Sequence, residues 1–389
     1  MPTLPSLLCF AAAAFGLLLA AAQHLALRRH LREPPRAPRS TPPVSILKPL
    51  CGLDDGLAQN LAAFAALDYP AYEVVLGLRS AGDAALPVAR AALQRWPGRF
   101  RLVFQRGEPG TNPKVNQLLT LARAARHDVL VVSDSNVRVG PDYLLGIAAA
   151  LDDEGVGLVT HPIAASGERR LGSLLDNLHL MAGVTPGVVG AKRLCGHDFV
   201  VGKSMALRRR DLEAMGGFEA VKDVLAEDWR MGTLVSSALG KRVAVAHRPI
   251  ENVSARRGLR EFASRHARWS VLQRQAVGPV AYTGQLFLNP VLLAGVGALL
   301  QPGLESAMAL GAVCCARAVI DGASVSLLRP EGLRLRQLAL VPLKDLVVGA
   351  AWCWGLVRRD VAWRGNRILV GPGTRIELPE AEPLEAAQA

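Results

Sequence analysis

The segment VLVVSDSN (residues 129–136) passes from a short apolar β-type run directly into side chains that carry oxygen atoms. A short apolar run bounded by polar residues predicts a buried strand. Similar runs occur earlier in the chain, at residues 44–47, 73–78 and 102–105. Between them, residues 57–67 and 86–96 show the apolar spacing of helices. Short strands that alternate with helices predict an α/β domain with a parallel sheet.

Two aspartates lie where such a sheet delivers ligands, at the carboxyl ends of its strands. Asp134 follows the run at 129–133, and Asp83 comes shortly after the run at 73–78. The sequence contains neither G-x-G-x-x-G nor G-x-x-x-x-G-K-[ST]. The dinucleotide fingerprint and the P-loop, the two commonest nucleotide-binding motifs, are therefore excluded.

The composition indicates membrane segments around a soluble middle. Half of the 389 residues are apolar, and the excess is concentrated at the two ends of the chain. The net charge is +12, but only 5% of the residues are aromatic, so no stacking platform for nucleic acid is evident. An anionic membrane surface or a diphosphate explains the charge better. The six cysteines have no metal-ligand spacing, which favours reduced thiols in a protein that faces the cytosol.

The N-terminal segment predicts an uncleaved membrane anchor at residues 1–27. Residues 1–23 carry no charge, and five arginines follow between Arg28 and Arg39. A signal peptide carries its positive charge before the apolar run, whereas here all of the charge comes after it. By the positive-inside rule the N-terminus is outside and the chain from Arg28 onward is cytosolic. Residues 28–43, rich in Pro and Arg, then form a linker to a cytosolic catalytic domain at 44–274.

A second membrane region is predicted at residues 275–357. The uncharged run 275–304 and the run 306–328 form a helical hairpin, with Arg317 and Asp321 at i, i+4 spacing as a neutralising pair. The run 338–357 holds two charges near its middle and is followed by Arg358 and Arg359, which conflicts with a simple crossing. It is interpreted as a transmembrane, re-entrant or interfacial segment before a tail at 358–389, and the topology of residues 338–389 stays open.

Several polar residues in the catalytic region are candidates for chemistry. Asp134, with Ser and Asn oxygens beside it, suits a hard divalent cation, although an aspartate also opens turns. Asp228 follows Glu227 and could act as a general base, or the pair could simply favour a helix N-terminus. Lys114 and Asn116 lie at the start of a helical run, where they could meet a phosphate and a base or ribose, or form a solvated helix start.

Arg265, Arg268 and Trp269 occupy positions i, i+3 and i+4 of a predicted helix and so share one face. The planar fork of arginine suits a diphosphate, because it makes two parallel hydrogen bonds. The alternative is a basic helix that anchors the domain at the membrane interface, where Arg and Trp are common.

Together these segments resemble the ceramide glucosyltransferase family and its bacterial relatives. The similarity spans roughly residues 44–370 in consistent order and is carried by LKPL (47–50), LDYP (67–70) with YEV (72–74), NPKVN (112–116), SDS (133–135) with VRV (137–139), AED (226–228), RxxRW (265–269) and WRGNR (363–367). Each motif alone is weak, whereas the ordered set is specific.

The resemblance implies a GT-A fold, a Rossmann-like mixed sheet, with inverting sugar transfer from UDP-glucose to ceramide or a similar lipid. Asp83 matches the first aspartate, near the nucleotide, and Asp134 the second, which coordinates Mg²⁺ or Mn²⁺ at the diphosphate. Asp228 matches the catalytic base. The segment with Arg265, Arg268 and Trp269 helps to hold the nucleotide-sugar. The sequence departs from the pattern at Asp134, where Asp-Ser-Asn replaces a DxD and leaves one evident carboxylate.

The expected protein is therefore an integral, multi-pass membrane enzyme with a cytosolic catalytic domain, in the cell inner membrane if the source is bacterial. Its expected partners are a UDP-sugar, a lipid acceptor and the membrane, and not nucleic acid. Hopanoid-biosynthesis glycosyltransferases are closely similar, so a hopanoid acceptor or a UDP-N-acetylglucosamine donor is an alternative. A processive polysaccharide synthase would need more membrane crossings. A non-catalytic lipid-binding scaffold would have no reason to keep Asp83, Asp134, Asp228 and Arg268 together.

Overall fold

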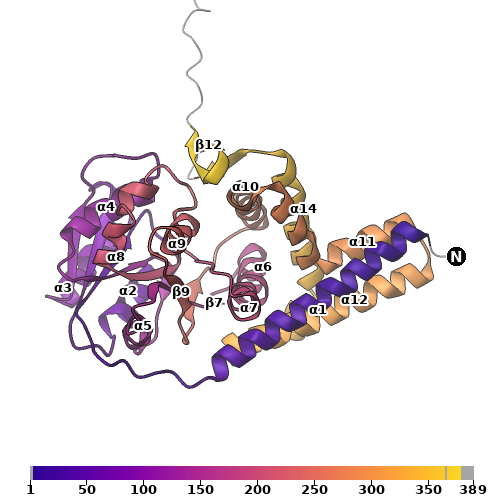
Figure 1. Ribbon diagram of the computed structural model, residues 1–389, viewed down its shortest axis with the longest axis horizontal. Coiled ribbons are helices and arrows are strands. Elements are labelled where there is room, and N and C mark those ends of the chain that lie inside the picture. Colours follow the sequence, from indigo (N-terminus) through magenta and orange to yellow (C-terminus); the bar gives the residue numbers. More distant parts are fainter. Residues whose placement is uncertain (1–2, 364–365, 378–389) are drawn as a thin grey trace, which may run out of the picture.

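A computed structural model describes residues 3–363 and 366–377 of the chain, and its centre is a seven-stranded mixed sheet (Figure 1). The strand order is β3-β2-β1-β4-β8-β6-β9. These strands are β1 (Val44–Pro49), β2 (Tyr72–Leu78), β3 (Phe100–Phe104), β4 (Val129–Ser133), β6 (Val156–Thr160), β8 (Ser204–Arg208) and β9 (Arg242–Val245).

The four strands predicted from the sequence are confirmed, and they are parallel to one another. Strand β4 has the predicted bounds, and all five of its residues are buried. Strand β8 runs antiparallel between β4 and β6, which makes the sheet mixed. Because β8 reverses direction, its first residues lie beside the carboxyl end of β4, where Asp134 leaves the sheet.

Helices cover both faces of this sheet, and each face has its own apolar core (Figure 1). One face is packed by α2 (Leu57–Ala65), α3 (Leu86–Arg95) and α5 (Tyr143–Leu151). The other is packed by α4 (Pro113–Ala124), α8 (Arg209–Ala214), η2 (Phe218–Val221) and α9 (Glu227–Ser237). Helix α4 starts at a side-chain cap, since the Asn112 side chain accepts hydrogen bonds from the backbone N–H groups of Lys114 and Val115.

A smaller layer links this sheet to the apolar helices. It contains a second sheet in the order β5-β10-β7 and a nearly continuous helical segment that includes one π-helical turn. Its elements are β5 (Val137–Arg138), β7 (Ile163–Ser166), β10 (Ile250–Val253), α6 (Leu171–His179), η1 (Leu180–Val184) and α7 (Thr185–Cys195).

Within the described part of the chain, three helices are long and apolar enough to cross a membrane. They are α1 (Leu4–Arg32), α12 (Leu304–Leu328) and the segment Leu335–Val357, which comprises α13 (Leu335–Leu338) and α14 (Val341–Val357). Figure 1 shows α1 lying along α12 and α11 (Pro290–Leu300), away from the large sheet. Large apolar side chains on the outside of these helices are exposed, among them Leu18 and Leu299. Such a surface is expected to face lipid. Helix α1 continues to Arg32, into the predicted linker, because Glu33-Pro34 is the first break in the helical pattern.

The uncharged run at 275–304 is divided rather than continuous. Helix α10 (Leu259–Gly284) contains a break at Gly278, whose φ of 81° lies in the left-handed region, and Pro279 follows. After η3 (Gln285–Leu288) the chain bends by 81° into α11, so the pair is either a broken span or a re-entrant loop. Helix α10 therefore begins in the predicted catalytic domain and ends in the predicted membrane region.

Helices α12 and α14 share a buried cluster of four charged side chains. The predicted pairing of Arg317 with Asp321 is confirmed, with 3.1 Å between Nε and Oδ1. The two charges of the last apolar run join it: Lys344 contacts Asp321 at 2.6 Å, and Asp345 contacts Arg317 at 3.2 Å. Two positive and two negative groups thus compensate one another inside the helical bundle.

The chain returns to the catalytic domain after α14. A short sheet of β11 (Asp360–Trp363), β12 (Asn366–Val370) and β13 (Ile376–Glu377), with η4 (Pro372–Thr374), packs against α10. The backbone N–H of Leu225 donates to the carbonyl of Thr374, which fixes this segment next to α9. The motif predicted at 363–367 includes Arg364 and Gly365, which lie outside the described residues.

Candidate active site

A cavity of about 1130 Å³ lies between the large sheet, the helices α7, α9 and α10, and the apolar helices. Its lining includes Asp134 after β4, Asp228 in α9, and Arg265, Arg268 and Trp269 in α10. Lys114 of α4 also lines it. Six of the eight site residues predicted from the sequence therefore meet at one cavity.

Asp134 is surrounded by ammonium groups. Its Oδ1 lies 2.9 Å from the Nζ of Lys114, and its Oδ2 lies 3.1 Å from the Nζ of Lys203. The Nζ of Lys48, which is fully buried, donates to the backbone carbonyl of Asp134 at 2.7 Å. Burial alone would raise the pKa of Asp134, but the two ion pairs outweigh it and hold the pKa below its ordinary value. Asp134 is therefore ionised at neutral pH.

Lys114 joins this carboxylate to a second one. Its Nζ lies 2.8 Å from Glu227 as well as 2.9 Å from Asp134. Burial disfavours the charged amine, but the two carboxylates more than compensate and raise the pKa of Lys114. Lys114 thus ties the end of β4 to the first residue of α9, directly beside Asp228.

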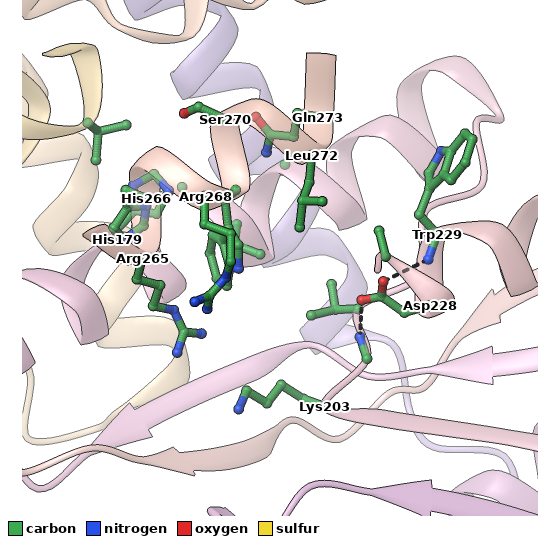
Figure 2. A pocket seen from close by; sticks show the side chains of 18 of the residues that line it. His179, Lys203, Asp228, Trp229, Arg265, His266, Arg268, Ser270, Leu272 and Gln273 are labelled. Atoms are coloured by element: carbon green, nitrogen blue, oxygen red, sulfur yellow. Dashed lines mark hydrogen bonds between the residues drawn. The ribbon is translucent and has the colours of Figure 1, made fainter. Parts of the chain in front are cut away.

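Asp228 is held in place by two backbone N–H groups. Gly202 donates to its Oδ2 at 2.7 Å, and Trp229 donates to its Oδ1 at 2.8 Å (Figure 2). A Cβ at Gly202 would lie 2.9 Å from Oδ2, so glycine allows this close approach. Burial and the neighbouring Glu227 raise the pKa of Asp228 to about 6. A carboxylate with a raised pKa that faces a cavity suits a general base.

Asp176 of α6 lies against the basic face of α10 and forms ion pairs with it. This carboxylate is fully buried and contacts Arg257, Arg265 at 3.5 Å and His266 at 3.3 Å. Arg265 also lies over the ring of Trp269, 4.4 Å from its centroid. Figure 2 shows Arg265 and Arg268 extending from α10 toward the side of the cavity that holds Lys203 and Asp228.

Replacing Asp176 by asparagine is expected to displace α10 rather than remove a reacting group. Three cationic or potentially cationic side chains would lose their shared counter-charge, and breaking such a buried pair costs about 3–5 kcal/mol. We expect a lower free energy of unfolding by chemical denaturation and a higher KM for the nucleotide-sugar. Asp211→Asn is the matched control, because Asp211 is another buried carboxylate shared by two cations, Arg208 and Lys241, and does not line the cavity. Equal loss of stability with an unchanged KM would contradict the positioning role.

Asp83 and Asn116 lie outside the cavity lining. Asp83 accepts hydrogen bonds from the backbone N–H groups of Gly52 and Ala85, so it joins the loop after β1 to the start of α3. Asn116 is buried, and its side-chain amide exchanges two hydrogen bonds with the backbone of Gly110. Both side chains hold loops in place through the backbone, and the nucleotide contacts expected of them stay predictions.

Three site residues were missed by sequence reasoning: Lys203, Asp54 and Asp176. Lys203 precedes β8, and only the antiparallel placement of β8 brings it to Asp134. Asp54 follows β1 and accepts a hydrogen bond from the Ser135 hydroxyl. Lys203 and Asp54 share one signal, a charged residue near an apolar strand, which many surface residues also show, whereas Asp176 lies inside α6 and lacks it.

The oxygen atoms after β4 fit a divalent cation that a phosphate helps to bind. The carboxylates of Asp134 and Asp54 and the hydroxyl of Ser135 are hard ligands, and Mg²⁺ is usually held by one or two carboxylates with phosphate and water. Within residues 3–363 and 366–377, no group of three or more His, Cys, Asp or Glu side chains could hold a metal ion by itself. A cation would therefore depend on the donor's phosphates.

The cavity continues toward the apolar helices. Its lining there includes Gln23 of α1, Gly187 of α7, His179 at the start of the π-helical turn, and the charged pair Arg317 and Asp345. One space thus connects Asp228 with the apolar helices, and it offers both apolar and polar walls.

Comparisons with known proteins agree with this architecture. The model of glycosyl transferase family 21 matches residues 8–376. Ceramide glucosyltransferase 1 of Caenorhabditis elegans is 28% identical over 239 residues, 60% of this chain and 50% of the relative. The ceramide glucosyltransferase of Komagataella phaffii is 28% identical over 213 residues, 49% of this chain and 41% of the relative. The chain thus spans about half the length of these curated relatives.

Among solved structures, a mannosyltransferase of Pyrobaculum calidifontis in complex with GDP-Man and Mn²⁺ covers 90% of this chain and 99% of its own. The TM-score is 0.50 and the identity is 19%, so the similarity concerns the fold. The mixed sheet of this chain is the GT-A glycosyltransferase fold, as predicted.

Proposed function

Because the chain belongs to glycosyl transferase family 21, we propose that it transfers glucose from UDP-glucose to the primary hydroxyl of ceramide or a similar lipid, with inversion at the anomeric carbon. The observation that carries this proposal is the single cavity that runs from Asp134 and Asp228 to the apolar helices. A water-soluble donor reaches such a cavity from the sheet, and a lipid acceptor reaches it from the membrane. Ceramide glucosyltransferases among the relatives support the lipid class.

In this mechanism Asp228 removes the proton of the acceptor hydroxyl as the oxygen attacks the anomeric carbon. The two backbone N–H groups of Gly202 and Trp229 orient the carboxylate, and its pKa of about 6 leaves it ionised yet basic at neutral pH. Arg265 and Arg268 face the same space and would stabilise the negative charge that develops on the departing diphosphate.

A divalent cation, Mg²⁺ or Mn²⁺, is proposed at Asp134, with Ser135 and Asp54 close by. When bound, it would supply positive charge that stabilises the departing diphosphate. Asp134 is ionised and already faces cations in the structure, which suits this role. The catalytic domain is proposed to face the cytosol, and the arginines between Arg28 and Arg39 support this side by the positive-inside rule.

The direct test is radiolabelled sugar transfer by the detergent-purified protein. UDP-glucose and UDP-N-acetylglucosamine are each combined with ceramide and with a hopanoid alcohol, with Mn²⁺ or with EDTA. Metal-dependent labelling of ceramide from UDP-glucose is the expected result. Labelling of the hopanoid alone would keep the mechanism and change the acceptor, and labelling of no lipid by folded protein would overturn the proposal.

Filling the membrane end of the cavity is expected to weaken acceptor binding selectively. Gly187 lines the cavity, and a Cβ added there meets no atom within 4 Å, so Gly187→Phe places a ring in open space. We expect the KM for the lipid to rise by about tenfold, which corresponds to ~1.4 kcal/mol of lost binding. The KM for the nucleotide-sugar should not change.

Gly311→Phe provides the matched control for this variant. Gly311 lies in α12, also has open space around an added Cβ, and is not part of the cavity lining. Steady-state kinetics with varied lipid and saturating donor distinguish the two variants. An unchanged lipid KM in Gly187→Phe would place the acceptor elsewhere.

A further inference from the structure

We propose that Lys203 binds the diphosphate of the donor, and that in the absence of donor it occupies the carboxylate of Asp134 in competition with the divalent cation. This inference rests on the proposed function, because it takes a nucleoside diphosphate as the ligand. It assigns a role to a lysine that the sequence motifs do not include.

The first step is the geometry around Asp134. Lys114 and Lys203 each take one of its two oxygens, at 2.9 Å and 3.1 Å. A divalent cation at the same carboxylate therefore competes with two ammonium groups for its negative charge, and is repelled by both.

The second step identifies which lysine lacks a counter-charge once a metal neutralises Asp134. Lys114 has another carboxylate partner, Glu227, at 2.8 Å, so it remains neutralised when it leaves Asp134. Lys203 also donates to the neutral amide oxygen of Asn136, at 2.8 Å. Once a metal holds Asp134, Lys203 is the ammonium group that needs a new anion.

The third step is the charge of the surroundings. Lys203 and Arg265 line the same cavity. Figure 2 shows the Lys203 side chain in the cavity between Asp228 and Arg265, with its ammonium end turned toward the arginine. Two cations that converge on one side of a cavity make a site for an anion with two or more negative oxygens.

The chemistry follows from these contacts. In the free protein Lys203 neutralises Asp134, and in the complex it forms a charge-assisted hydrogen bond with a phosphate oxygen. Its positive charge thus moves from a protein carboxylate to the leaving group. Donor and metal binding are coupled in consequence, because the diphosphate removes the ammonium group that competes with the metal.

The test is Lys203→Met, which keeps the length of the side chain and removes its charge. UDP binding is measured by titration calorimetry in EDTA, so that no metal contributes. We expect the affinity to fall by about 10–100-fold, the range for one lost hydrogen bond between charged groups. Mn²⁺ binding without nucleotide is measured by the paramagnetic resonance of free Mn²⁺. It is expected to strengthen by about three- to fivefold, because an ion-pair competitor is gone.

Lys241→Met is the matched control. Lys241 is ion-paired with Asp211 at 2.6 Å, and this carboxylate retains Arg208 at 3.0 Å, as Asp134 retains Lys114. Neither affinity should change in this variant. Opposite changes of the two affinities in Lys203→Met alone support the proposal, since a merely destabilised protein would lose both.

An unchanged UDP affinity in Lys203→Met, or an Mn²⁺ affinity that does not strengthen, would overturn the proposal. The outcome is separable from that of the proposed function. If wild-type protein binds UDP but labels no lipid, the proposed lipid transfer is wrong and the proposal for Lys203 still stands. If wild-type protein labels lipid and Lys203→Met binds UDP and Mn²⁺ as wild type does, the lipid transferase proposal stands and the proposal for Lys203 is wrong.

Discussion

Replacing Asp228 by asparagine is expected to lower kcat by about 10²–10⁴-fold, the usual contribution of a positioned general base. The asparagine side chain has the same size, so the fold around Gly202 and Trp229 should persist. Radiolabelled transfer at saturating donor and lipid measures the loss. Full activity in a folded Asp228→Asn protein would exclude this residue as the base.

The pH profile of wild-type activity should also show the ionisation of Asp228. The base acts when it is ionised, so kcat/KM is expected to fall as pH decreases through about 6, the raised pKa of Asp228. The effect on stability has the opposite sign. A carboxyl group whose folded pKa exceeds its ordinary value binds more protons in the folded state, so its contribution to stability decreases as pH rises through that window.

The stability of Asp228→Asn relative to wild type is therefore expected to be most favourable at pH 8, where the buried carboxylate costs most, although the amide keeps only one of the two backbone hydrogen bonds. Asp198→Asn is a useful control, since Asp198 also accepts a backbone hydrogen bond, from Val243, and does not line the cavity. That variant should lose stability and keep its kcat. Thermal unfolding of the three proteins at pH 8 distinguishes these expectations.

Replacing Asp134 by asparagine is expected to abolish activity and also to destabilise the protein. Lys114 and Lys203 would lose the carboxylate between them, and removing one partner of such a buried cluster costs about 3–5 kcal/mol. We expect a loss of at least about 10³-fold in kcat/KM, because metal binding and the electrostatics of the leaving group are both affected. Chemical denaturation and metal-binding titration measure the two parts separately.

The double variant Asp134→Asn with Lys203→Met isolates the electrostatic cause. It removes one negative and one positive group together, so much of the lost stability should return while activity remains absent. A double variant as unstable as Asp134→Asn would indicate that packing, and not uncompensated charge, is responsible. Asp228→Asn and Asp134→Asn thus both impair catalysis, but only Asp134→Asn is expected to leave buried ammonium groups without their counter-charge.

Local features of the site could be predicted from the sequence because they depend on neighbours along the chain. The strand Val129–Ser133 and the aspartate after it are adjacent, and Arg265, Arg268 and Trp269 share one helical face by spacing alone. The ordered motifs then predicted the family and the GT-A fold, which the comparisons confirm.

The ion pairs of the site join segments that lie far apart in the sequence. Lys203 meets Asp134 only because β8 enters the sheet antiparallel to β4, and Asp176 meets Arg265 only through the packing of α6 on α10. No periodicity within one segment reports such pairings. The break in α10 is a different case, because the Gly278-Pro279 dipeptide predicts it from the sequence. The dipeptide could have been used to divide the apolar run.

The four charges shared by α12 and α14 have a consequence for biogenesis. Charged side chains at the centre of a spanning helix each add about 2.5–3.5 kcal/mol to its insertion into the bilayer, so Lys344 and Asp345 burden α14 when it leaves the ribosome. Asp321 and Arg317 relieve that cost, and they lie on the helix that is synthesised first. Helix α12, which precedes α14 in the chain, thus supplies partner charges that offset this cost when the two helices pack together.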